Sequence, residues 1–262
     1  DHGTGVTVHT AGGKKFTGAA LIGADGLWSK IRPAIIDDGD PIVSGHIAYR
    51  AVLPIKDVPA VLYPWMQDVV LWGGPRSHLV HYKLRRGELF NIVAVFHSQK
   101  YVKGWDEYGD PEELRHHFNG APKEVQALLD KIDVWKMWVL CDRKPAREWS
   151  KGRVTLIGDA AHPMLQYLAA GAGMAMEDSV CLADLLEQHH GDIERVFADY
   201  PAQRYLRTGR VQLTARFYGD IYHAEGVTRE LRNLMLGGDE PTGAYKGVEW
   251  LYKEGSGAPG GN

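Results

Sequence analysis

The sequence has few cysteines, little excess charge and no long apolar run. Its two cysteines, Cys141 and Cys181, form no Cys-x-x-Cys pair, which excludes a disulfide framework and suits a reducing cytoplasm. The formal net charge of -3, with both signs interspersed, gives no electrostatic basis for binding nucleic acid or an anionic membrane. No stretch approaches the roughly 20 apolar residues that span a bilayer. We therefore expect a cytoplasmic globular protein.

The first residues resemble the interior of a sheet more than a natural start. No initiator Met is present, and Val6-Thr7-Val8-His9-Thr10 alternates like a strand before a turn at residues 12–15. An uncharged, mostly apolar stretch follows at residues 19–23. We therefore interpret the sequence as a piece of a longer protein.

The spacing of apolar residues predicts an α/β protein that also carries an antiparallel sheet. Short buried strands are expected at residues 19–23 and 154–158. Alternating runs separated by turn signals predict the antiparallel strands 47–53, 69–72, 78–84 and 89–96. Helical spacing predicts helices that open near Ser29, cover 111–129 behind an Asp110 cap, and cover about 171–186 and 192–225.

Both predicted buried strands end in a glycine and an aspartate. The first gives Gly23-Ala24-Asp25-Gly26, and the second gives Gly158-Asp159-Ala160. A carboxylate at the carboxyl end of a buried strand lies where open α/β sheets bind ligands, and glycine lets backbone approach a ligand closely. For either turn alone, a tight turn with an aspartate N-cap is the simpler interpretation.

Taken together and in this order, the two turns resemble a known family. Residues 23–32 are similar to the Asp-Gly motif, and residues 158–163 to the Gly-Asp motif, of single-component (class A) FAD-dependent aromatic hydroxylases. The similarity continues to Asp178. It implies a partial Rossmann-like FAD-binding domain without the N-terminal segment that binds the ADP half of the cofactor. The implied domains are 1–40 (FAD-binding), 41–145 (antiparallel-sheet substrate domain), 146–188 (FAD-binding return) and 189–262 (C-terminal helices and a mobile tail).

The resemblance also assigns cofactor roles to residues near both turns. Asp159 would bind the ribityl chain of FAD, Asp25 would lie near the pyrophosphate, and Arg32 would support that loop. The predicted helix near Gly171 would direct its unpaired N–H groups at the anionic reduced flavin, although a simple glycine-permitted loop is the alternative. The remaining cofactor-binding residues implied in this way are Gly158, Pro163, Ala169, Gly171, Ala172, Gly173 and Met174.

One alternating run resembles the substrate-facing strand of 3-hydroxybenzoate 6-hydroxylases and salicylate hydroxylases. His78, Val80 and Tyr82 share one face of this run, and His81 lies on the other face as a structural residue. The resemblance implies that His78 and Gln166 contact the substrate phenol and that Tyr82 and Val80 line the pocket. A histidine near neutral pKa can remove a phenolic proton, which activates the ring toward an electrophilic oxygen. Without the resemblance, a lone strand histidine is usually structural.

These observations predict an FAD-dependent monooxygenase that uses NADH or NADPH and O2. The expected reaction converts 3-hydroxybenzoate to 2,5-dihydroxybenzoate. Two alternatives stay open: a decarboxylating salicylate hydroxylase, and a fragment that is inactive without its N-terminal FAD-binding piece. Expected partners are the aromatic acid, O2, a separate chain that carries the missing segment, and a second copy in a homodimer.

Several other patterns have simpler explanations than a binding site. The two residues of each neighbouring pair, His116-His117 and His189-His190, point about 100° apart on a helix and chelate an ion poorly, so we expect a solvated surface there and no metal site. Residues 255–260 match G-x-G-x-x-G, but no strand precedes them. The helical spacing of Arg204, Arg207 and Arg210 favours a solvated face, and Trp135, Trp138 and Trp149 are expected in a core or an interface.

Overall fold

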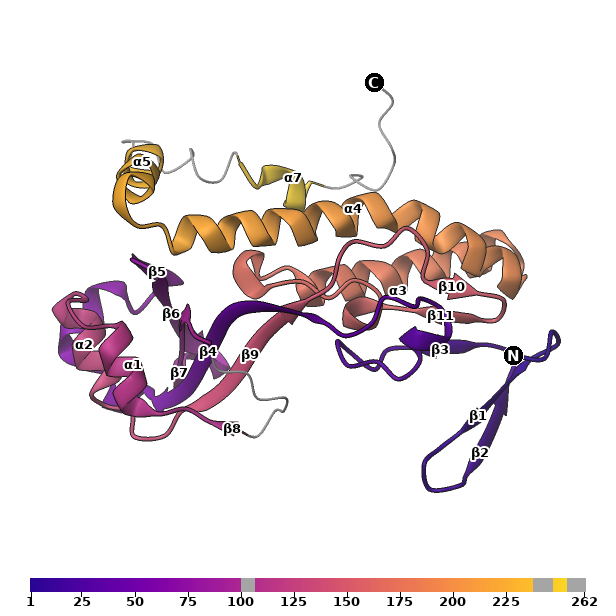
Figure 1. The fold of residues 1–262 in the computed structure, drawn as a ribbon, viewed down its shortest axis with the longest axis horizontal. Helices are drawn as coiled ribbons and strands as arrows, with labels where there is room; N and C mark the ends of the chain where they lie inside the picture. Colours follow the sequence, from indigo (N-terminus) through magenta and orange to yellow (C-terminus); the bar gives the residue numbers. More distant parts are fainter. Residues whose placement is uncertain (100–106, 238–246, 254–262) are drawn as a thin grey trace. The chain divides into compact units, whose positions relative to one another are not determined.

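Figure 1 shows the computed structural model of the chain, which describes residues 1–99, 107–237 and 247–253. The chain divides into two compact units. The first unit comprises Asp1–Ile42, Cys141–Tyr218 and Tyr245–Asn262, and the second comprises Val43–Leu140 and Gly219–Ala244. The chain therefore leaves the first unit, builds most of the second, and then returns to the first.

The first unit contains a hairpin, a small sheet and two long helices. Strands β1 (Val6–His9) and β2 (Lys15–Gly18) form the predicted antiparallel hairpin. In the small sheet, β11 (Val154–Leu156) is the centre, with β10 (Ser150–Lys151) antiparallel on one side and β3 (Leu21–Gly23) parallel on the other. This unit also contains the helix α3 (Gly171–Gln188), most of the helix α4 (Ile193–Tyr222) and the short helix α7 (Glu249–Tyr252).

The core of the first unit forms where α3 and α4 pack with β11. The buried residues of α3 are Met174, Asp178, Leu182 and Leu185, whose spacing of four, four and three residues places them on one helical face. Leu182 and Leu185 pack in one cluster with Trp149, Leu156 and Tyr200, among others. An aspartate within this otherwise apolar stripe needs partners, because a buried charge is unstable without them.

At the N-terminal side of this unit one prediction is wrong and another is correct only in part. The expected helix near Ser29 is only a 3-10 turn at Arg32–Ala34, because Pro33 lacks the N–H that a helix beginning there would need. The expected buried strand at residues 19–23 is the three-residue β3, in which Ile22 is 44% exposed.

The second unit is built on a six-stranded sheet with the strand order β5-β6-β7-β4-β9-β8. Its strands are β4 (Ile42–Pro54), β5 (Val70–Gly74), β6 (Ser77–Leu84), β7 (Leu89–His97), β8 (Glu107–Tyr108) and β9 (Lys136–Asp142). The pairs β5–β6, β6–β7 and β4–β7 are antiparallel, which confirms the sheet that the alternating runs predicted.

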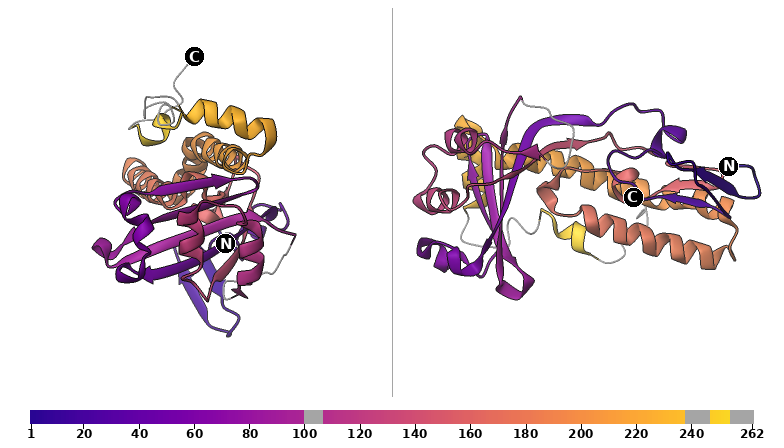
Figure 2. Two further views of the ribbon diagram at one scale, coloured as in Figure 1. Left: turned by 90° about the vertical axis from the view of Figure 1, so that its left-hand side faces the viewer. Right: turned by 90° about the horizontal axis from the view of Figure 1, so that it is seen from below.

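Two short helices cover one face of this sheet (Figures 1 and 2). Helix α1 (Pro111–His117) begins at the predicted cap, where Asp110 Oδ1 accepts a hydrogen bond from Glu112 N at 2.9 Å. The single helix expected over 111–129 is wrong, because α2 (Lys123–Leu129) is separate from α1. Gly120 takes a φ of 81° between them, and Pro122 disfavours helical backbone at the residue before it.

The remaining elements lie toward the C-terminus. Helix α5 (Gly226–Leu236) belongs to the second unit, and the Gly-rich run at 255–260 lies outside the described residues. Within the described ranges, no helix combines the length and the apolar character needed to cross a membrane. Cys141 and Cys181 are free thiols.

Candidate functional site

The two acidic turns leave the same edge of the small sheet in the first unit. β3 and β11 are parallel, with Gly23 opposite Leu156, and Ile157 N donates to Gly23 O at 3.0 Å. Asp25 follows Gly23 by two residues, and Asp159 follows Leu156 by three. Since the carboxyl ends of neighbouring parallel strands meet at one edge, both aspartates stand at the position where α/β sheets bind ligands.

Asp25 closes its own turn. Its Oδ2 accepts hydrogen bonds from the backbone N–H groups of Lys30 at 2.7 Å and Ile31 at 3.4 Å. Partial burial raises the pKa of Asp25, but hydrogen bonds from Ser29 and from these backbone groups outweigh it and hold the pKa below its usual range. The carboxylate is therefore ionised at neutral pH, and the turn-forming interpretation that the sequence left open is part of its role.

Arg32 joins the two turns. Its side chain is 1% exposed, and Nη1 donates to the carbonyl oxygens of Ala160 at 2.8 Å and Ala161 at 2.6 Å. Its other guanidinium nitrogens bind Asp38, which also accepts a hydrogen bond from Arg143 at 3.0 Å. Arg32 thus fixes the backbone that follows Asp159 relative to the turn that follows Asp25.

The Gly-Asp turn packs against the beginning of α3. Gly158 has a φ of 56°, and a Cβ there would lie 3.1 Å from the Cβ of Ala175, so glycine suits both the backbone and the space. Asp159 is exposed, and its Oδ1 lies 3.8 Å from the position that a Cβ on Gly171 would take. Desolvation by the surrounding protein raises the pKa of Asp159, while His162 opposes this. A hydroxyl donor would stabilise this carboxylate.

The buried carboxylate of Asp178 holds the turn in place from α3. Asp178 is 0% exposed, and its Oδ2 accepts from Gly158 N at 2.9 Å and lies 2.7 Å from His162 Nε2. Its Oδ1 accepts from Arg204 Nε, on α4, at 2.9 Å. Burial raises the pKa of Asp178, but the His162 hydrogen bond and charge, the Gly158 N–H and the Arg204 charge together hold it below its usual range.

The start of α3 has the features of an anion-binding helix terminus. No side chain caps it, its first turn carries no acidic residue, and Ala169 just before it has a φ of 51°. The first N–H groups of a helix lack intrahelical partners and carry partial positive charge. A Cβ on Gly173 would meet nothing within 4 Å, so this end of the helix is also sterically open.

The predicted flavin-binding residues therefore fall within one unit. Asp25 accepts a hydrogen bond from Lys30 N, and Arg32 donates to the carbonyl oxygen of Ala160, directly after Asp159. Pro163 O accepts a hydrogen bond from Gln212 on α4 at 2.9 Å. Ala169, Gly171, Ala172, Gly173 and Met174 follow along the same loop and helix start. Gln166 lies in a 3-10 turn of this unit, whereas the other predicted substrate residues belong to the second.

In the second unit, β6 carries the predicted substrate residues on alternating positions. His78 is 3% exposed, and Val80 and Tyr82 are half-buried on the same face. Leu79 and His81, on the other face, are both 0% exposed, and the His81 ring lies between those of Trp72 and Phe90. Burial lowers the pKa of His78 to about 3 and that of His81 to about 4. Both rings are therefore neutral at pH 7.

His78 does not stand alone, because three further histidines gather beside it. His78 Nδ1 lies 2.7 Å from His223 Nε2, and His223 Nδ1 lies 3.1 Å from His97 Nε2. His46 pairs with His97 across β4 and β7, and their rings stack with centroids 4.3 Å apart. The sequence pattern did not reveal this group, because its four members lie on β4, β6, β7 and the residue after α4, and only the fold brings them together.

Comparison with known proteins gives the family. Residues 2–192 match the family described as "FAD binding domain", which covers more than half of the chain. This chain belongs to the FAD-binding domain family. The 3-hydroxybenzoate 6-hydroxylase of Klebsiella oxytoca is 43% identical over 94% of this chain and 62% of its own length. The 3-hydroxybenzoate 6-hydroxylase 2 of Aquipseudomonas alcaligenes is 41% identical over 94% of this chain and 76% of its own.

Solved structures of other proteins share this fold. A salicylate hydroxylase substrate complex matches with a TM-score of 0.80 and 28% identity over 97% of this chain and 66% of that one. Klebsiella pneumoniae HpxO complexed with FAD and uric acid matches with a TM-score of 0.77 and 25% identity over 89% of this chain. The chain spans 60 to 62% of three of the 3-hydroxybenzoate 6-hydroxylases that it matches.

The residues present fit the cofactor of this family. A flavin dinucleotide offers sugar-alcohol hydroxyls, which suit the exposed carboxylate of Asp159, and a ring that becomes anionic on reduction, which suits the uncapped start of α3. Gly158 and Gly171 let the backbone approach closely beside that carboxylate. The first unit thus supplies a donor and acceptor set that matches the flavin end of FAD.

The structure corrects the prediction of a solvated arginine face on α4. Arg204 is 5% exposed and binds both Asp178 and Glu177. Arg207 donates to Glu177 at 2.6 Å from two of its nitrogens, and Arg210 lies 3.8 Å from the ring centroid of Trp250. The helical spacing of these arginines was predicted correctly. It could not show that Glu177 and Asp178 of α3 lie against this face of α4.

The tryptophans and the neighbouring histidine pairs, for which the sequence predicted no binding site, lie partly in the core and partly at the surface. Trp135 and Trp149 are each 1% exposed, which confirms their predicted core positions, and Trp138 lies under the guanidinium of Arg50. His189 binds Asp199 at 2.8 Å, and His117 stacks on Phe96, so neither of these two is a simply solvated residue as expected.

We predict that Asp178→Ala destabilises the protein by about 3–5 kcal/mol, because it leaves Arg204 buried without its carboxylate partner. The same substitution removes the carboxylate that binds the Gly158 N–H and His162. Urea unfolding of the complete protein measures the change. Glu187→Ala, an exposed acid on the same helix, is the control and should change stability by less than about 0.5 kcal/mol. Equal effects of the two substitutions would contradict the role of Asp178.

We also predict that acid destabilises the second unit through its buried neutral histidines. The unfolded chain takes up a proton on each histidine near pH 6.5, whereas folded His81 resists protonation down to about pH 4. The unfolded state therefore binds more protons in this window, and stability falls as the pH falls. His81→Leu should reduce the slope of unfolding free energy by at most about 1.4 kcal/mol per pH unit. Urea unfolding between pH 7 and pH 4.5, followed by tryptophan fluorescence, tests this, and an unchanged slope would refute it.

Proposed function

We propose that the complete protein to which this chain belongs is an FAD-dependent monooxygenase of a hydroxybenzoate-type acid. The proposed reaction uses NADH or NADPH and O2 to convert 3-hydroxybenzoate to 2,5-dihydroxybenzoate. The observation that carries the proposal is the pair of acidic turns on one sheet edge, joined by Arg32 beside the uncapped start of α3. The names of the relatives with 41 to 44% identity support the choice of substrate.

The first unit would hold the cofactor. Asp159 would accept hydrogen bonds from the ribityl chain, the Asp25 turn would lie near the pyrophosphate, and the α3 start would stabilise negative charge on the reduced ring. Bound FAD would supply the transfer of electrons from the nicotinamide to O2 and of one oxygen atom to the substrate. Arg32 and Asp178 would keep the two turns in register without touching the cofactor.

The second unit would activate the substrate. We assign the contact with the substrate phenol to His78, whose ring Nδ1 lies 2.7 Å from His223 Nε2. A neutral imidazole can accept the phenolic proton, and the resulting electron density at the para carbon favours attack on an electrophilic oxygen. Tyr82 and Val80, on the same face of β6, would line the pocket, and Gln166 would orient the hydroxyl.

A decarboxylating salicylate hydroxylase is the second candidate, and the similarity to the salicylate hydroxylase substrate complex favours it. Both reactions need the same flavin site and the same activation of a phenol, so product chemistry separates them. The complete protein is incubated with each acid, NADH or NADPH, and O2. We expect 2,5-dihydroxybenzoate from 3-hydroxybenzoate. Release of CO2 from salicylate, without formation of 2,5-dihydroxybenzoate, would replace our proposal by the second candidate.

We predict that Asp159→Ala weakens FAD binding roughly 10- to 100-fold, the usual effect of losing a hydrogen bond to a charged group. Flavin absorbance after dialysis of the complete protein, and titration of the apoprotein with FAD, measure the affinity. Asp184→Ala, an exposed acid farther along α3, should leave the affinity within about twofold. If Asp159→Ala kept the affinity of the unsubstituted protein, its assigned cofactor contact would be wrong.

A further inference from the structure

We propose that His46, His97 and His223 form a binding site for a divalent transition-metal ion, and that zinc is the ion that fits it best. Each of the three residues offers one ring nitrogen, and these nitrogens all lie within 4.8 Å of one another. All three residues belong to the second unit. The proposal concerns metal binding alone, so it does not depend on the proposed reaction.

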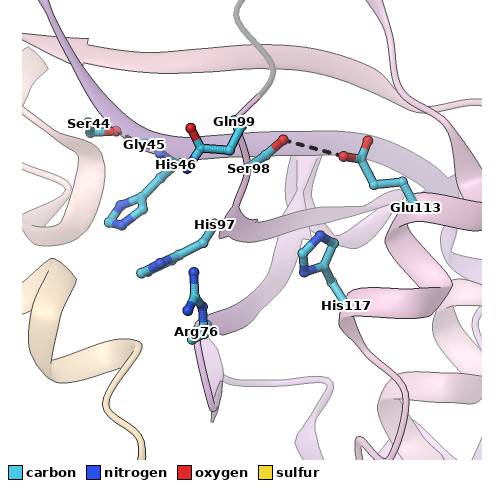
Figure 3. A pocket seen from close by; sticks show the side chains of 9 residues that line it. All are labelled: Ser44, Gly45, His46, Arg76, His97, Ser98, Gln99, Glu113 and His117. Atoms are coloured by element: carbon cyan, nitrogen blue, oxygen red, sulfur yellow. Dashed lines mark hydrogen bonds between the residues drawn. The ribbon is translucent and has the colours of Figure 1, made fainter.

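Strand register brings the first two ligands together. His46 on β4 lies directly opposite His97 on β7 in the antiparallel pair. Residues that are directly opposite project from the same face of a sheet, with Cβ atoms about 4.5–5.5 Å apart. Their rings accordingly lie side by side, with centroids 4.3 Å apart (Figure 3). The pair therefore presents two imidazoles from regular strands, which hold ligands more precisely than loops do.

Backbone hydrogen bonds hold the third ligand beside this pair. His223 follows the end of α4, and its carbonyl oxygen accepts a hydrogen bond from Arg76 N at 3.0 Å. The carbonyl oxygen of Arg76 in turn accepts one from His97 N at 3.2 Å. The His223 ring is buried and meets the ring of His46 edge-on, with centroids 4.7 Å apart. The position of His223 is thus tied to the strand that carries His97.

The nitrogen separations are close to those of a zinc site. His223 Nδ1 lies 3.1 Å from His97 Nε2. Zn–N bonds of about 2.0–2.1 Å at tetrahedral angles place two ligand nitrogens about 3.3 Å apart. Because the three nitrogens lie within 4.8 Å, closing them around one ion needs movements of roughly 1.5 Å at most, of the kind that side chains commonly make on binding. Zinc would replace the contact between His97 and His223.

His78 supplies the outer contact that a metal-bound histidine needs. A histidine that binds a metal through one ring nitrogen usually donates the proton on its other nitrogen to a neighbouring group, which fixes the orientation of the ring. His223 Nε2 lies 2.7 Å from His78 Nδ1. With zinc on Nδ1, His223 would donate through this existing contact. Metal binding and the contact with His78 are therefore compatible.

The chemistry of the ligands selects the class of ion. Imidazole suits zinc, copper, iron and nickel, whereas magnesium and calcium prefer oxygen ligands. The charges that act on His97 are mixed, because Glu225 and Asp220 favour a positive charge there and Arg76 and His117 oppose it. Ligation by the three rings, and not an acidic surrounding, must supply the affinity. This excludes a site for hard cations and favours zinc.

A cavity gives the ion access and a fourth position. His46 and His97 both line a cavity of about 620 Å³, and Glu113 and His117 lie farther along it (Figure 3). At about 30 Å³ per water molecule, this volume has room for on the order of 20 waters. Zinc sites with three protein ligands keep the fourth position for water or another small ligand. The proposed site would therefore open onto solvent through this cavity.

A cluster of rings that binds no metal is the competing explanation. The rings of His46 and His97 stack at an interplanar angle of 29°, and zinc would open this stack because two imidazoles on one ion diverge from it. The two explanations differ in their affinity for zinc, so a metal titration decides between them.

The test measures zinc binding by the complete, FAD-loaded protein after removal of any polyhistidine tag. The protein is treated with a chelator, dialysed into metal-free buffer, and titrated with zinc in competition with a fluorescent zinc indicator. Elemental analysis of the dialysed, zinc-loaded protein gives the stoichiometry. We expect a single zinc ion per chain, which millimolar magnesium or calcium does not displace.

Substitutions locate the ion. His46→Ala and His97→Ala should each weaken zinc binding more than about 100-fold, because loss of an outer-shell partner alone costs about 10- to 100-fold. His117→Ala, which lines the same cavity outside the proposed site, is the matched control and should change the affinity less than about twofold. Circular dichroism and flavin absorbance verify that each variant is folded and loaded.

Cobalt(II) provides a measurement that needs no variant. It replaces zinc in many sites, and a tetrahedral cobalt site absorbs visible light strongly whereas an octahedral one absorbs weakly. The difference spectrum between FAD-loaded protein with and without cobalt should show the strong tetrahedral bands, and added zinc should remove them. This result is expected even if the alanine variants do not fold.

Two outcomes would overturn the site: a purely octahedral cobalt spectrum, or equal zinc affinity in the unsubstituted protein and folded His46→Ala and His97→Ala variants. Hydroxylation of 3-hydroxybenzoate is measured separately. Its failure would overturn the proposed function without bearing on the zinc titration.

Discussion

The candidate flavin site depends on one buried carboxylate. Asp178 is fully buried on α3 and satisfies a backbone N–H of the Gly-Asp turn, a histidine of the same loop and an arginine of α4 at once. A buried charge is stable only with such a set of partners, so the three segments are positioned together or not at all. The exposed Asp159 can then be held beside the start of α3 without bonds of its own to the scaffold.

Local sequence patterns predicted the parts of the site that lie within short segments. The two acidic turns, the Asp110 cap and the helix from Gly171 each follow from residues a few positions apart. Failures occurred where one or two residues changed the outcome. Pro33 did so for the helix expected near Ser29, and Gly120 and Pro122 did so for the helix expected over 111–129. In those places the apolar residues keep helical spacing, although the backbone cannot continue as one helix.

Contacts between distant segments were beyond the sequence. Arg204 was predicted to be solvated because it recurs with Arg207 and Arg210 at helical spacing. Only the packing of α4 along α3 reveals that it binds Asp178 and Glu177. His97 and His223 are 126 positions apart, and no local pattern records the strand register that places His97 beside His46. The available signal in the sequence was the repetition of histidine, a residue that is seldom fully buried, at strand ends. This signal does not show which of the histidines contact one another.

The buried histidines also show how function and stability differ in the second unit. A neutral imidazole that is buried and unpaired loses its hydrogen bonds to water, and replacement by an apolar side chain can be neutral or stabilising. His81 is of this kind, since neither of its ring nitrogens has a partner in the described parts of the chain. His78 and His223, buried to a similar degree, satisfy one another. Removal of His81 therefore leaves no hydrogen-bond partner behind, whereas removal of His78 or His223 takes away the partner of a buried ring nitrogen on the other.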